Sequence, residues 1–364
     1  MENWESYVRK VVPYVPGEQP DREKMIKLNT NENPYPPSPK VLEALRQLDA
    51  DRLRLYPEPD CGVLVNAIAQ YYGLDSSQVF VGVGSDDVLA MIFQTFFQSD
   101  RPILFPDITY SFYDVWADLF RIPYQTKPLD ENFRIRKEDY CQRSGGVIFP
   151  NPNAPTGVLM DLSEVEEIIA ANRDVIVVVD EAYIDFGGVS ALPLIQTYKN
   201  LLVVQTFSKS RSLAGMRIGF AMGNPKLIRY INDVKYSFNS YTMNRTSLLL
   251  GAAAIRDREY FEQTTAKIIQ TREWLKQELT DLGFSFPDSK SNFVFATHKS
   301  VPAKQIFEAL QERDIYVRYF AKERIDNYLR ISVGTREEME QFIHILRQYF
   351  ASFSFQSKST ACRR

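Results

Sequence analysis

The stretch that decides the fold reads VIVVVDEAY and occupies residues 175–183. Five consecutive β-branched residues are typical of a strand that is buried on both faces, as in the middle of a parallel sheet. The run ends at Asp180, so a carboxylate stands at the carboxyl end of the predicted strand. Ligands of open α/β sheets bind at that edge, and we therefore expect Asp180 to face a ligand.

Strands and helices alternate on both sides of this stretch. Short apolar runs predict further strands at residues 79–83, 103–105, 147–149, 201–206 and 217–221. Apolar residues at helical spacing predict helices at residues 41–48, 63–72, 87–97, 110–120 and 162–171. This alternation predicts an α/β fold, namely a three-layer sandwich of helices around a mainly parallel sheet.

Composition divides the chain into four parts. Residues 1–35 are rich in proline and asparagine, which predicts an extended arm rather than a packed element. Residues 36–245 carry the alternating pattern and form the predicted large domain. Residues 246–350 predict a smaller α+β domain, and the serine-rich residues 351–364 predict a mobile tail.

The composition excludes several classes of protein. The 43 Lys and Arg against 46 Asp and Glu give a net charge of −3. The chain thus has no excess of positive charge with which to bind nucleic acid or an anionic membrane. The two histidines, His298 and His344, are too far apart for a zinc protease motif and leave little for a Ser-His-Asp triad. Cys61, Cys141 and Cys362 form neither a zinc ribbon nor a disulfide framework. We expect a cytoplasmic protein without a metal site, whose chemistry depends on a lysine, a tyrosine, a carboxylate or a cofactor.

Three further motifs are expected at the same edge of the sheet as Asp180. Lys209 follows the predicted strand 201–206, Arg217 comes eight residues later, and the turn NPNAPTG at residues 151–157 follows the strand 147–149. A single loop lysine is more often a solvated side chain than a reactive one. Together, however, an acid, a lysine, an arginine and a rigid turn suit a pyridoxal phosphate site. The lysine would form the Schiff base, the acid would keep the pyridine nitrogen protonated, and the arginine would take the phosphate.

With these motifs in the order found, the chain resembles the fold type I aminotransferases and, more closely, the histidinol-phosphate aminotransferases. The resemblance runs from Tyr14 to about Arg336. Its most specific pieces are the sequences YPE at 56–58, GSDD at 84–87, DEAY at 180–183 and SKSRSLAGMR at 208–217. It implies an exchange of the amino group between L-histidinol phosphate and 2-oxoglutarate in histidine biosynthesis, with pyridoxal 5'-phosphate as the cofactor.

The resemblance implies a role for each residue around the cofactor ring. Lys209 would bind the cofactor covalently and move the proton, and Asp180 would pair with the pyridinium nitrogen. Tyr183 would donate a hydrogen bond to the phenolic oxygen, and Tyr110 would stack on the ring. Plain core packing is the alternative for Tyr110, because the chain has 20 tyrosines.

The cofactor phosphate is expected at the start of the helix that Ser85 and Asp86 open, where free N–H groups and the helix dipole favour an anion. Ser208 and Arg217 would assist there. In the family, the residue at the position of Tyr56 reaches the phosphate of the partner subunit, which implies a homodimer. Core packing is again the alternative reading for Tyr56.

The substrate side of the resemblance maps to Tyr14, Arg318 and Arg330. Arg330 would clamp the phosphate of histidinol phosphate or the carboxylate of glutamate, because a guanidinium fork matches either anion. Surface ion pairs are the alternative for the two arginines. Together the three residues favour a dianionic ligand over a plain amino acid.

One position departs from the family pattern. The family usually has asparagine before Pro-Thr-Gly, and this amide binds the phenolic oxygen of the cofactor. Here the residue is Ala154, so either the neighbouring Asn153 reaches the oxygen or Tyr183 alone holds it. Our hypothesis is that Asn153 compensates.

Several other functions remain open from the sequence. An aromatic amino acid aminotransferase or a threonine-phosphate decarboxylase would share most of these motifs. The segment GVGSDD at 82–87 resembles a dinucleotide fingerprint, but Asp87 replaces its third glycine, so a Rossmann dehydrogenase is a poor alternative. A cofactor-bound regulator would need a basic helix-turn-helix module ahead of the fold, and no basic segment precedes the arm.

Overall fold

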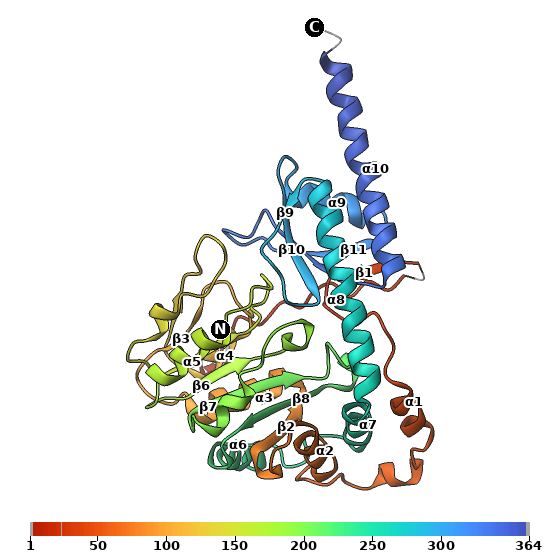
Figure 1. The fold of residues 1–364 in the computed structure, drawn as a ribbon. Helices are drawn as coiled ribbons and strands as arrows, with labels where there is room; N and C mark the ends of the chain where they lie inside the picture. Colours follow the sequence, from red (N-terminus) through yellow and green to blue (C-terminus); the bar gives the residue numbers. More distant parts are fainter. Residues whose placement is uncertain (1–2, 23, 362–364) are drawn as a thin grey trace.

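A computed structural model describes residues 3–22 and 24–361, which form two domains around two sheets (Figure 1). The larger sheet has the order β2-β8-β7-β6-β5-β3-β4. Its strands are β2 (Val79–Val83), β3 (Ile103–Pro106), β4 (Tyr124–Lys127), β5 (Gly146–Pro150), β6 (Val177–Asp180), β7 (Leu201–Thr206) and β8 (Ile218–Gly223). Strands β7 to β4 pair in parallel, whereas β8 is antiparallel to both of its neighbours. The prediction of a mainly parallel sheet is confirmed.

Helices cover both faces of this sheet. Val177 and Val179 of β6 pack into one core with α1, α2, α5 and α7, while Val178 packs into the opposite core with α3, α4 and α6. The helices are α1 (Pro39–Arg46), α2 (Gly62–Tyr72), α3 (Gly84–Phe96), α4 (Tyr113–Phe120), α5 (Leu162–Ala171), α6 (Pro225–Phe238) and α7 (Arg245–Arg256). Burial on both faces explains the continuous apolar run of β6 and gives the predicted three-layer sandwich.

The smaller domain is a five-stranded sheet covered by helices. Its order is β1-β11-β12-β10-β9, and β1 is parallel to β11 while the other pairs are antiparallel. Its elements are β1 (Ile26–Leu28), α8 (Arg258–Asp281), β9 (Phe284–Ser285), β10 (Phe293–His298), α9 (Ala303–Gln311), β11 (Ile315–Tyr319), β12 (Leu329–Ser332) and α10 (Arg336–Ala361). Helix α8 rises from the large domain into the small one (Figure 1).

Three boundaries differ from those expected. Residues 26–28 of the arm form β1 and join the small sheet through β11, so this part of the arm is a packed element. Helix α7 packs against α1 and α2, so the chain leaves the large domain at α8 and not at residue 246. Helix α10 continues to Ala361 because no proline or glycine stops it, and residues 362–364 of the predicted tail lie outside the described residues.

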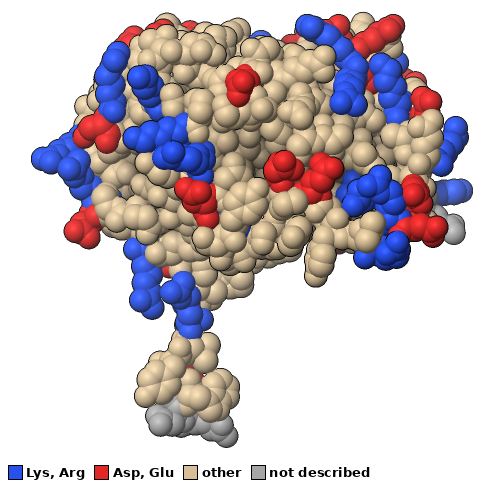
Figure 2. Space-filling model, turned by 90° about the horizontal axis from the view of Figure 1, so that it is seen from below, with Lys and Arg blue, Asp and Glu red and all other residues tan. Residues whose placement is uncertain are grey.

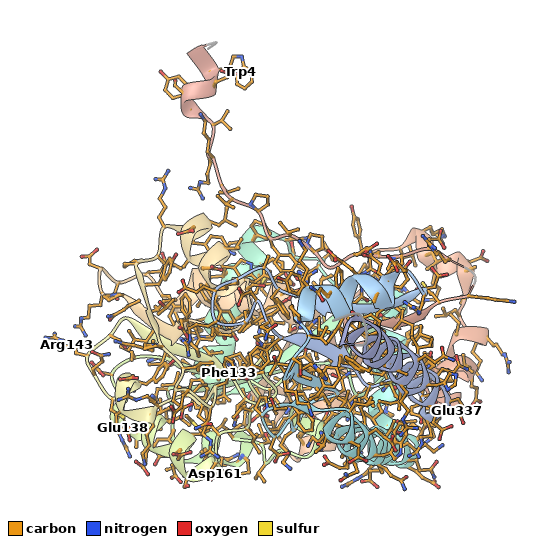
Figure 3. The ribbon with its side chains drawn as sticks, turned by 90° about the horizontal axis from the view of Figure 1, so that it is seen from above. Trp4, Phe133, Glu138, Arg143, Asp161 and Glu337 are labelled. Carbon is orange, nitrogen blue, oxygen red and sulfur yellow. The ribbon has the colours of Figure 1, made fainter. Side chains whose placement is uncertain are left out.

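Short 3-10 helices connect the main elements. They are η1 (Asn3–Tyr7), η2 (Ala50–Arg54), η3 (Ser76–Gln78), η4 (Lys137–Tyr140), η5 (Ile184–Phe186), η6 (Leu192–Gln196) and η7 (Ala214–Met216). Helix η1, which carries Trp4, lies at the outer end of the arm and stands away from both domains (Figure 3).

Charges of both signs are mixed on the face that Figure 2 shows, around a wide area without charged side chains. No helix within residues 3–22 and 24–361 is both long and apolar enough to cross a lipid bilayer. The same part of the chain contains no group of three His, Cys, Asp or Glu side chains that could hold a metal ion.

Candidate active site

The carboxyl ends of β5, β6 and β7 meet at one edge of the large sheet, because the three strands are parallel. Asp180 is the last residue of β6, and Lys209 follows three residues after the end of β7. The turn at residues 151–157 follows β5 directly. The topology therefore brings together the motifs that the sequence predicted at this edge.

Asp180 is buried beneath the site. The hydroxyl of Tyr113, in the first turn of α4, donates to Asp180 Oδ2 over 2.9 Å, and the backbone N–H of Ala182 donates to Oδ1 over 3.3 Å. Burial raises the pKa of Asp180 to about 6, and the Tyr113 hydrogen bond opposes this rise. A cationic ring nitrogen at this carboxylate would favour its ionised form.

Lys209 points toward the N-terminal arm. Its Nζ donates to the carbonyl oxygen of Thr30 over 3.0 Å and lies 5.8 Å from the centre of the Tyr183 ring. The side chain of Asn33 donates to the carbonyl oxygen of Lys209 over 3.0 Å, which fixes the backbone of the lysine. The amine is thus held between the arm and Tyr183.

The start of α3 is built to receive an anion. No side chain caps this helix, whose first N–H groups have no partner inside the helix. Gly84 adopts φ +82°, and a Cβ at this position would lie 2.6 Å from Arg217 Nη2. A Cβ at Gly219 would collide with the backbone nitrogen of Ser85. Two glycines therefore keep the backbone open beside the arginine.

Arg217, Asp86 and Tyr110 are linked beside this helix start. Arg217 Nη2 lies 3.1 Å from Asp86 Oδ2, and the Tyr110 hydroxyl donates to Asp86 Oδ1 over 2.6 Å. Arg217 Nη1 also lies 3.5 Å from the hydroxyl oxygen of Ser208. Burial, and next the charge of Asp86, raise the pKa of Tyr110 well above its usual range. Four of the residues predicted for the phosphate and the ring are therefore neighbours.

Asn153 is buried, and its hydrogen bonds define what it can still offer a ligand. Its Nδ2 donates to the carbonyl oxygen of Ile108 over 3.0 Å and to Thr156 Oγ1 over 3.1 Å. Its Oδ1 is buried without a hydrogen-bond partner among the described residues. Ala154 lies in the core of the small domain together with Tyr183. The free group of Asn153 is thus an acceptor, so donation to a cofactor oxygen would require Asn153 to give up a present bond.

Arg330 and Arg318 face each other on β12 and β11 as paired residues of the small sheet. Arg330 Nη2 donates to the carbonyl oxygen of Asn29 over 3.0 Å, and its Nε is buried without a partner among the described residues. Burial lowers the pKa of Arg330, and the nearby Arg318 lowers it further, whereas Tyr183 and Tyr14 oppose this. Such an arginine favours binding of an anion.

Tyr14 and Tyr56 lie in different surroundings. The ring of Tyr14 stacks on Phe112 at 4.1 Å between centres and lies near Arg330. The ring of Tyr56 stacks on Tyr241 at 4.7 Å and is 79% exposed on the surface. Tyr56 therefore lies outside the group formed by the other predicted residues.

Four residues at the site were missed by sequence reasoning: Tyr113, Thr30, Asn31 and Asn33. Tyr113 lies in the predicted helix at residues 110–120, and its position in a helix gives no sign of a site role. The other three belong to the arm, where asparagines alternate at positions 29, 31 and 33. This alternation was the available signal, because asparagine stabilises turns and bent backbone through its side chain.

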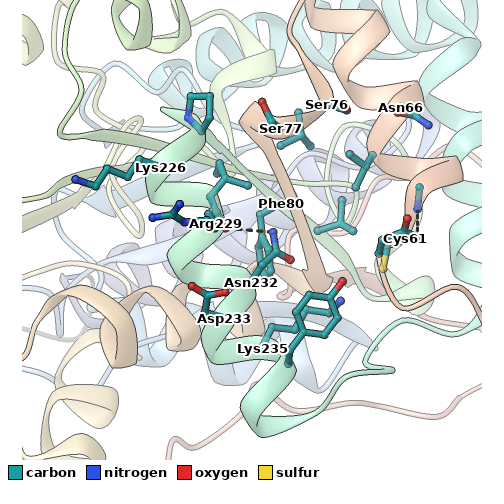
Figure 4. A pocket seen from close by; sticks show the side chains of 18 residues that line it. Cys61, Asn66, Ser76, Ser77, Phe80, Lys226, Arg229, Asn232, Asp233 and Lys235 are labelled. Carbon is teal, nitrogen blue, oxygen red and sulfur yellow. Dashed lines mark hydrogen bonds between the residues drawn. The ribbon is translucent and has the colours of Figure 1, made fainter.

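A hollow of about 980 Å³ lies elsewhere on the large domain, between α2, β2 and α6 (Figure 4). None of the predicted site residues lines it. The ammonium of Lys235 on its wall is already bound to the carbonyl oxygen of Pro59. The hollow is thus separate from the site at the sheet edge.

The surroundings of the segment at 82–87 also bear on the dehydrogenase alternative. Strand β2 lies at the edge of the sheet and is antiparallel to β8, so β2 and α3 are not part of a parallel dinucleotide-binding unit. The glycine-rich turn therefore begins α3 in a fold that differs from that of a Rossmann dehydrogenase.

Comparisons with known proteins show the family of the chain. The profile of the family Aminotransferase class I and II matches residues 23–346. A histidinol-phosphate aminotransferase of Clostridium acetobutylicum is 52% identical over 348 residues, which are 96% of this chain and 99% of that protein. One of Clostridium beijerinckii is 54% identical over 344 residues, which are 94% and 96% of the two chains.

A solved structure gives the same fold. The histidinol-phosphate aminotransferase of Sinorhizobium meliloti in complex with pyridoxal-5'-phosphate superposes with a TM-score of 0.81 at 24% identity, covering 90% of this chain and 92% of that one. The resemblance read from the motifs is confirmed, and the dehydrogenase alternative is wrong. The chain belongs to the class I and II aminotransferases, which depend on pyridoxal phosphate, and within them to the histidinol-phosphate aminotransferases.

Proposed function

We propose that the protein transfers the amino group between L-histidinol phosphate and 2-oxoglutarate in the cytoplasm, forming imidazole acetol phosphate and glutamate in histidine biosynthesis. One observation favours a substrate that carries an anion close to its amine. Arg330 binds the carbonyl oxygen of Asn29, and Lys209 binds that of Thr30, the next residue. A cation for an anion and a reactive amine thus lie side by side. Histidinol phosphate carries its amine and its phosphate ester on adjacent carbons, which suits this spacing.

The residues present fit the cofactor. The uncapped start of α3 and the open backbone at Gly84 and Gly219 suit a phosphate, which Ser85, Ser208 and Arg217 would bind. Asp86 would hold Arg217 and Tyr110 in place beside it.

Around the ring, Asp180 would pair with the pyridine nitrogen, Tyr183 would donate to the phenolic oxygen, and Tyr110 would stack on one face. When bound, pyridoxal phosphate supplies a ring that accepts the electron pair left on the substrate carbon after proton removal. Asp180 supports this chemistry because its buried carboxylate favours a protonated ring nitrogen.

Lys209 would move the proton. Its Nζ lies 5.8 Å from the centre of the Tyr183 ring, and the Thr30 carbonyl oxygen holds it without neutralising its charge. On the substrate side, Arg330 and Arg318 would bind the phosphate of histidinol phosphate or the distal carboxylate of glutamate, and Tyr14 would close the arm over it.

A homodimer completes the proposal, with Tyr56 reaching the cofactor phosphate of the partner subunit. Its stacking partner Tyr241 is 46% exposed, and two large apolar side chains close in sequence to this pair are exposed as well: Leu53 is 63% exposed and Phe238 72%. An exposed apolar area of this kind is typical of a protein–protein contact. Light scattering with size-exclusion chromatography should give twice the chain mass.

Activity assays with purified holoenzyme test the reaction. Turnover of histidinol phosphate should exceed that of phenylalanine and of threonine phosphate, and glutamate should bleach the yellow colour of the protein. Lys209→Ala should abolish turnover, whereas Lys199→Ala, at an exposed lysine before β7, should not. Release of CO₂ from threonine phosphate, or a preference for phenylalanine, would refute the substrate choice while leaving the family intact.

A further inference from the structure

Residues 29–33, with the sequence NTNEN, connect the two domains at the active site. We call them the arm segment. Its members bind Arg330 and Ser332 in the small domain, and Tyr183 and Lys209 in the large domain. The function derived so far uses the carbonyl oxygens of Asn29 and Thr30 and the side chain of Asn33. One side chain in it has a further part.

Asn31 is almost fully buried, and every polar group of this residue is engaged. Its Nδ2 donates to the Tyr183 hydroxyl oxygen over 3.0 Å, and its Oδ1 accepts from the Ser332 hydroxyl over 3.0 Å. Its backbone N–H donates to Ser332 Oγ over 2.9 Å, and its carbonyl oxygen accepts from Asn292 Nδ2 over 2.9 Å. The φ of +57° is one that asparagine tolerates better than most residues. The side chain is thus held from both sides.

The direction of the bond to Tyr183 determines what that hydroxyl can do. A phenolic hydroxyl has one hydrogen to give, and an amide Nδ2 can only donate. While Asn31 donates, it occupies a lone pair of the Tyr183 oxygen, and the hydroxyl hydrogen remains available for another acceptor. The Ser332 bond to Oδ1 fixes the amide in this orientation.

The residue at position 154 explains why the direction of the hydrogen bond between Asn31 and Tyr183 matters for cofactor binding. Ala154 has no polar side-chain atom and packs in the same apolar core as Tyr183. Both amide hydrogens of Asn153 are already used by Ile108 and Thr156. Neither position 153 nor position 154 then has a free side-chain donor, whereas Tyr183 keeps its hydroxyl hydrogen for the phenolic oxygen.

We propose that Asn31 is a positioning residue that keeps the hydroxyl hydrogen of Tyr183 directed at the phenolic oxygen of the cofactor, and so compensates from the arm for the amide that Ala154 lacks. The inference rests on the role of Tyr183 in the proposed function. It also links the cofactor to the substrate clamp, because Ser332 and Arg330 lie on the same face of β12, two residues apart.

The nitrogen that joins Lys209 to the cofactor takes up a proton, and its pKa depends on the hydrogen bonds to the phenolic oxygen. This pKa can be measured without any turnover. A donor to the phenolic oxygen stabilises its negative charge most strongly when the neighbouring nitrogen has lost its proton, so it lowers this pKa. Losing one such hydrogen bond should raise it by about 0.5 to 1. The absorbance of the holoenzyme during a pH titration measures the value directly.

We expect Asn31→Gly, which keeps the backbone angle accessible, to raise this pKa, whereas Asn132→Gly in an exposed loop should not change it. Adding Ala154→Asn should lower the value again, because an amide then replaces the lost support. In a Tyr183→Phe background, Asn31→Gly should have no additional effect. Thermal unfolding of each apoprotein checks that the variants fold.

Asn31→Asp provides a second variant of nearly the same size. Its carboxylate would take the hydroxyl hydrogen of Tyr183, so the pKa should rise at least as far as in Asn31→Gly. An unchanged pKa in both Asn31 variants would overturn the inference. So would a rise in the Tyr183→Phe background, on adding Asn31→Gly, as large as the rise that Asn31→Gly causes in the wild type. A normal titration with no turnover of histidinol phosphate would instead contradict the proposed substrate and leave Asn31 in its role.

Discussion

The guanidinium of Arg217 lies 3.1 Å from the carboxylate of Asp86, directly beside the glycine that begins α3. The charge of the arginine is therefore partly balanced before any anion binds, and its position depends on the free space at Gly84. The helix start and the arginine form one binding unit, although 131 positions separate Arg217 from Asp86.

Gly84→Ala should strongly weaken pyridoxal phosphate binding. The new Cβ would lie 2.6 Å from Arg217 Nη2, and φ +82° is strained for alanine, at a cost of about 1–2 kcal/mol. Titrating the apoprotein with the cofactor should show a dissociation constant raised about tenfold or more. Gly215→Ala is the matched control, because a Cβ at that position meets nothing within 4 Å. Equal effects of the two substitutions would contradict the proposed phosphate site at the start of α3.

Tyr113→Phe should change the pH dependence of cofactor binding. The pKa of Asp180 is raised to about 6, so the apoprotein should lose affinity for pyridoxal phosphate as the pH falls through this value and the carboxylate takes up a proton. Without the Tyr113 hydrogen bond the ionised form is less stable, and the midpoint should move upward by about one pH unit. Tyr140→Phe is a control, because the Tyr140 hydroxyl is buried without a partner among the described side chains. If Tyr113→Phe leaves the pH midpoint of cofactor binding unchanged, the Tyr113 hydrogen bond does not stabilise the ionised form of Asp180.

Glu181→Gln should flatten the pH dependence of apoprotein stability. Burial raises the pKa of Glu181 to about 7, although Ser190, Ala191 and Gln205 donate hydrogen bonds to it. The unfolded chain releases this proton at lower pH, so the free energy of unfolding falls as the pH rises from about 4.5 through 7, by on the order of 3 kcal/mol. Denaturant unfolding at pH 5 and pH 8 measures the difference. It should shrink in Glu181→Gln but not in Glu138→Gln, at an exposed position at the edge of the molecule (Figure 3).

Arg330→Lys should impair substrate binding more than cofactor binding. Lysine keeps the charge but loses the fork that matches a phosphate or carboxylate, so KM for histidinol phosphate should rise about tenfold or more. The affinity for pyridoxal phosphate should stay within about twofold of wild type. Arg143→Lys, at an exposed arginine on the outer rim, should change neither quantity (Figure 3). A KM that remained at the wild-type value would remove Arg330 from the substrate site.

The large sheet could be predicted because its strands carry their own signal. The runs at 79–83 and 201–206 match β2 and β7 residue for residue, since all residues of these strands except Val83 are buried. Strand β4 was missed because its residues Tyr124–Lys127 lie at the sheet edge and are largely polar and exposed. Strand β1 is only three residues long, which is too short for any periodicity to show.

The site was predictable where it follows from strand ends. Asp180 ends one strand and Lys209 follows its parallel neighbour, and this geometry alone places them at one edge. Asn31 and Tyr113 were not predictable in the same way, because their partners at the site are distant in sequence: Asn31 lies 152 positions from Tyr183, and Tyr113 lies 67 from Asp180. Patterns of local periodicity contain no information about such contacts.

The arm segment also has a consequence for how the protein is made. The partner of Asn31, Ser332, is synthesised 301 positions after it. A nascent chain that ends between Lys209 and β12 already contains Asp180 and Lys209 but lacks Arg330 and the serine that orients Asn31. Synthesis must therefore pass β12 before the arm segment can take its final place, and a chain terminated between Lys209 and β12 has the reactive lysine without Arg330.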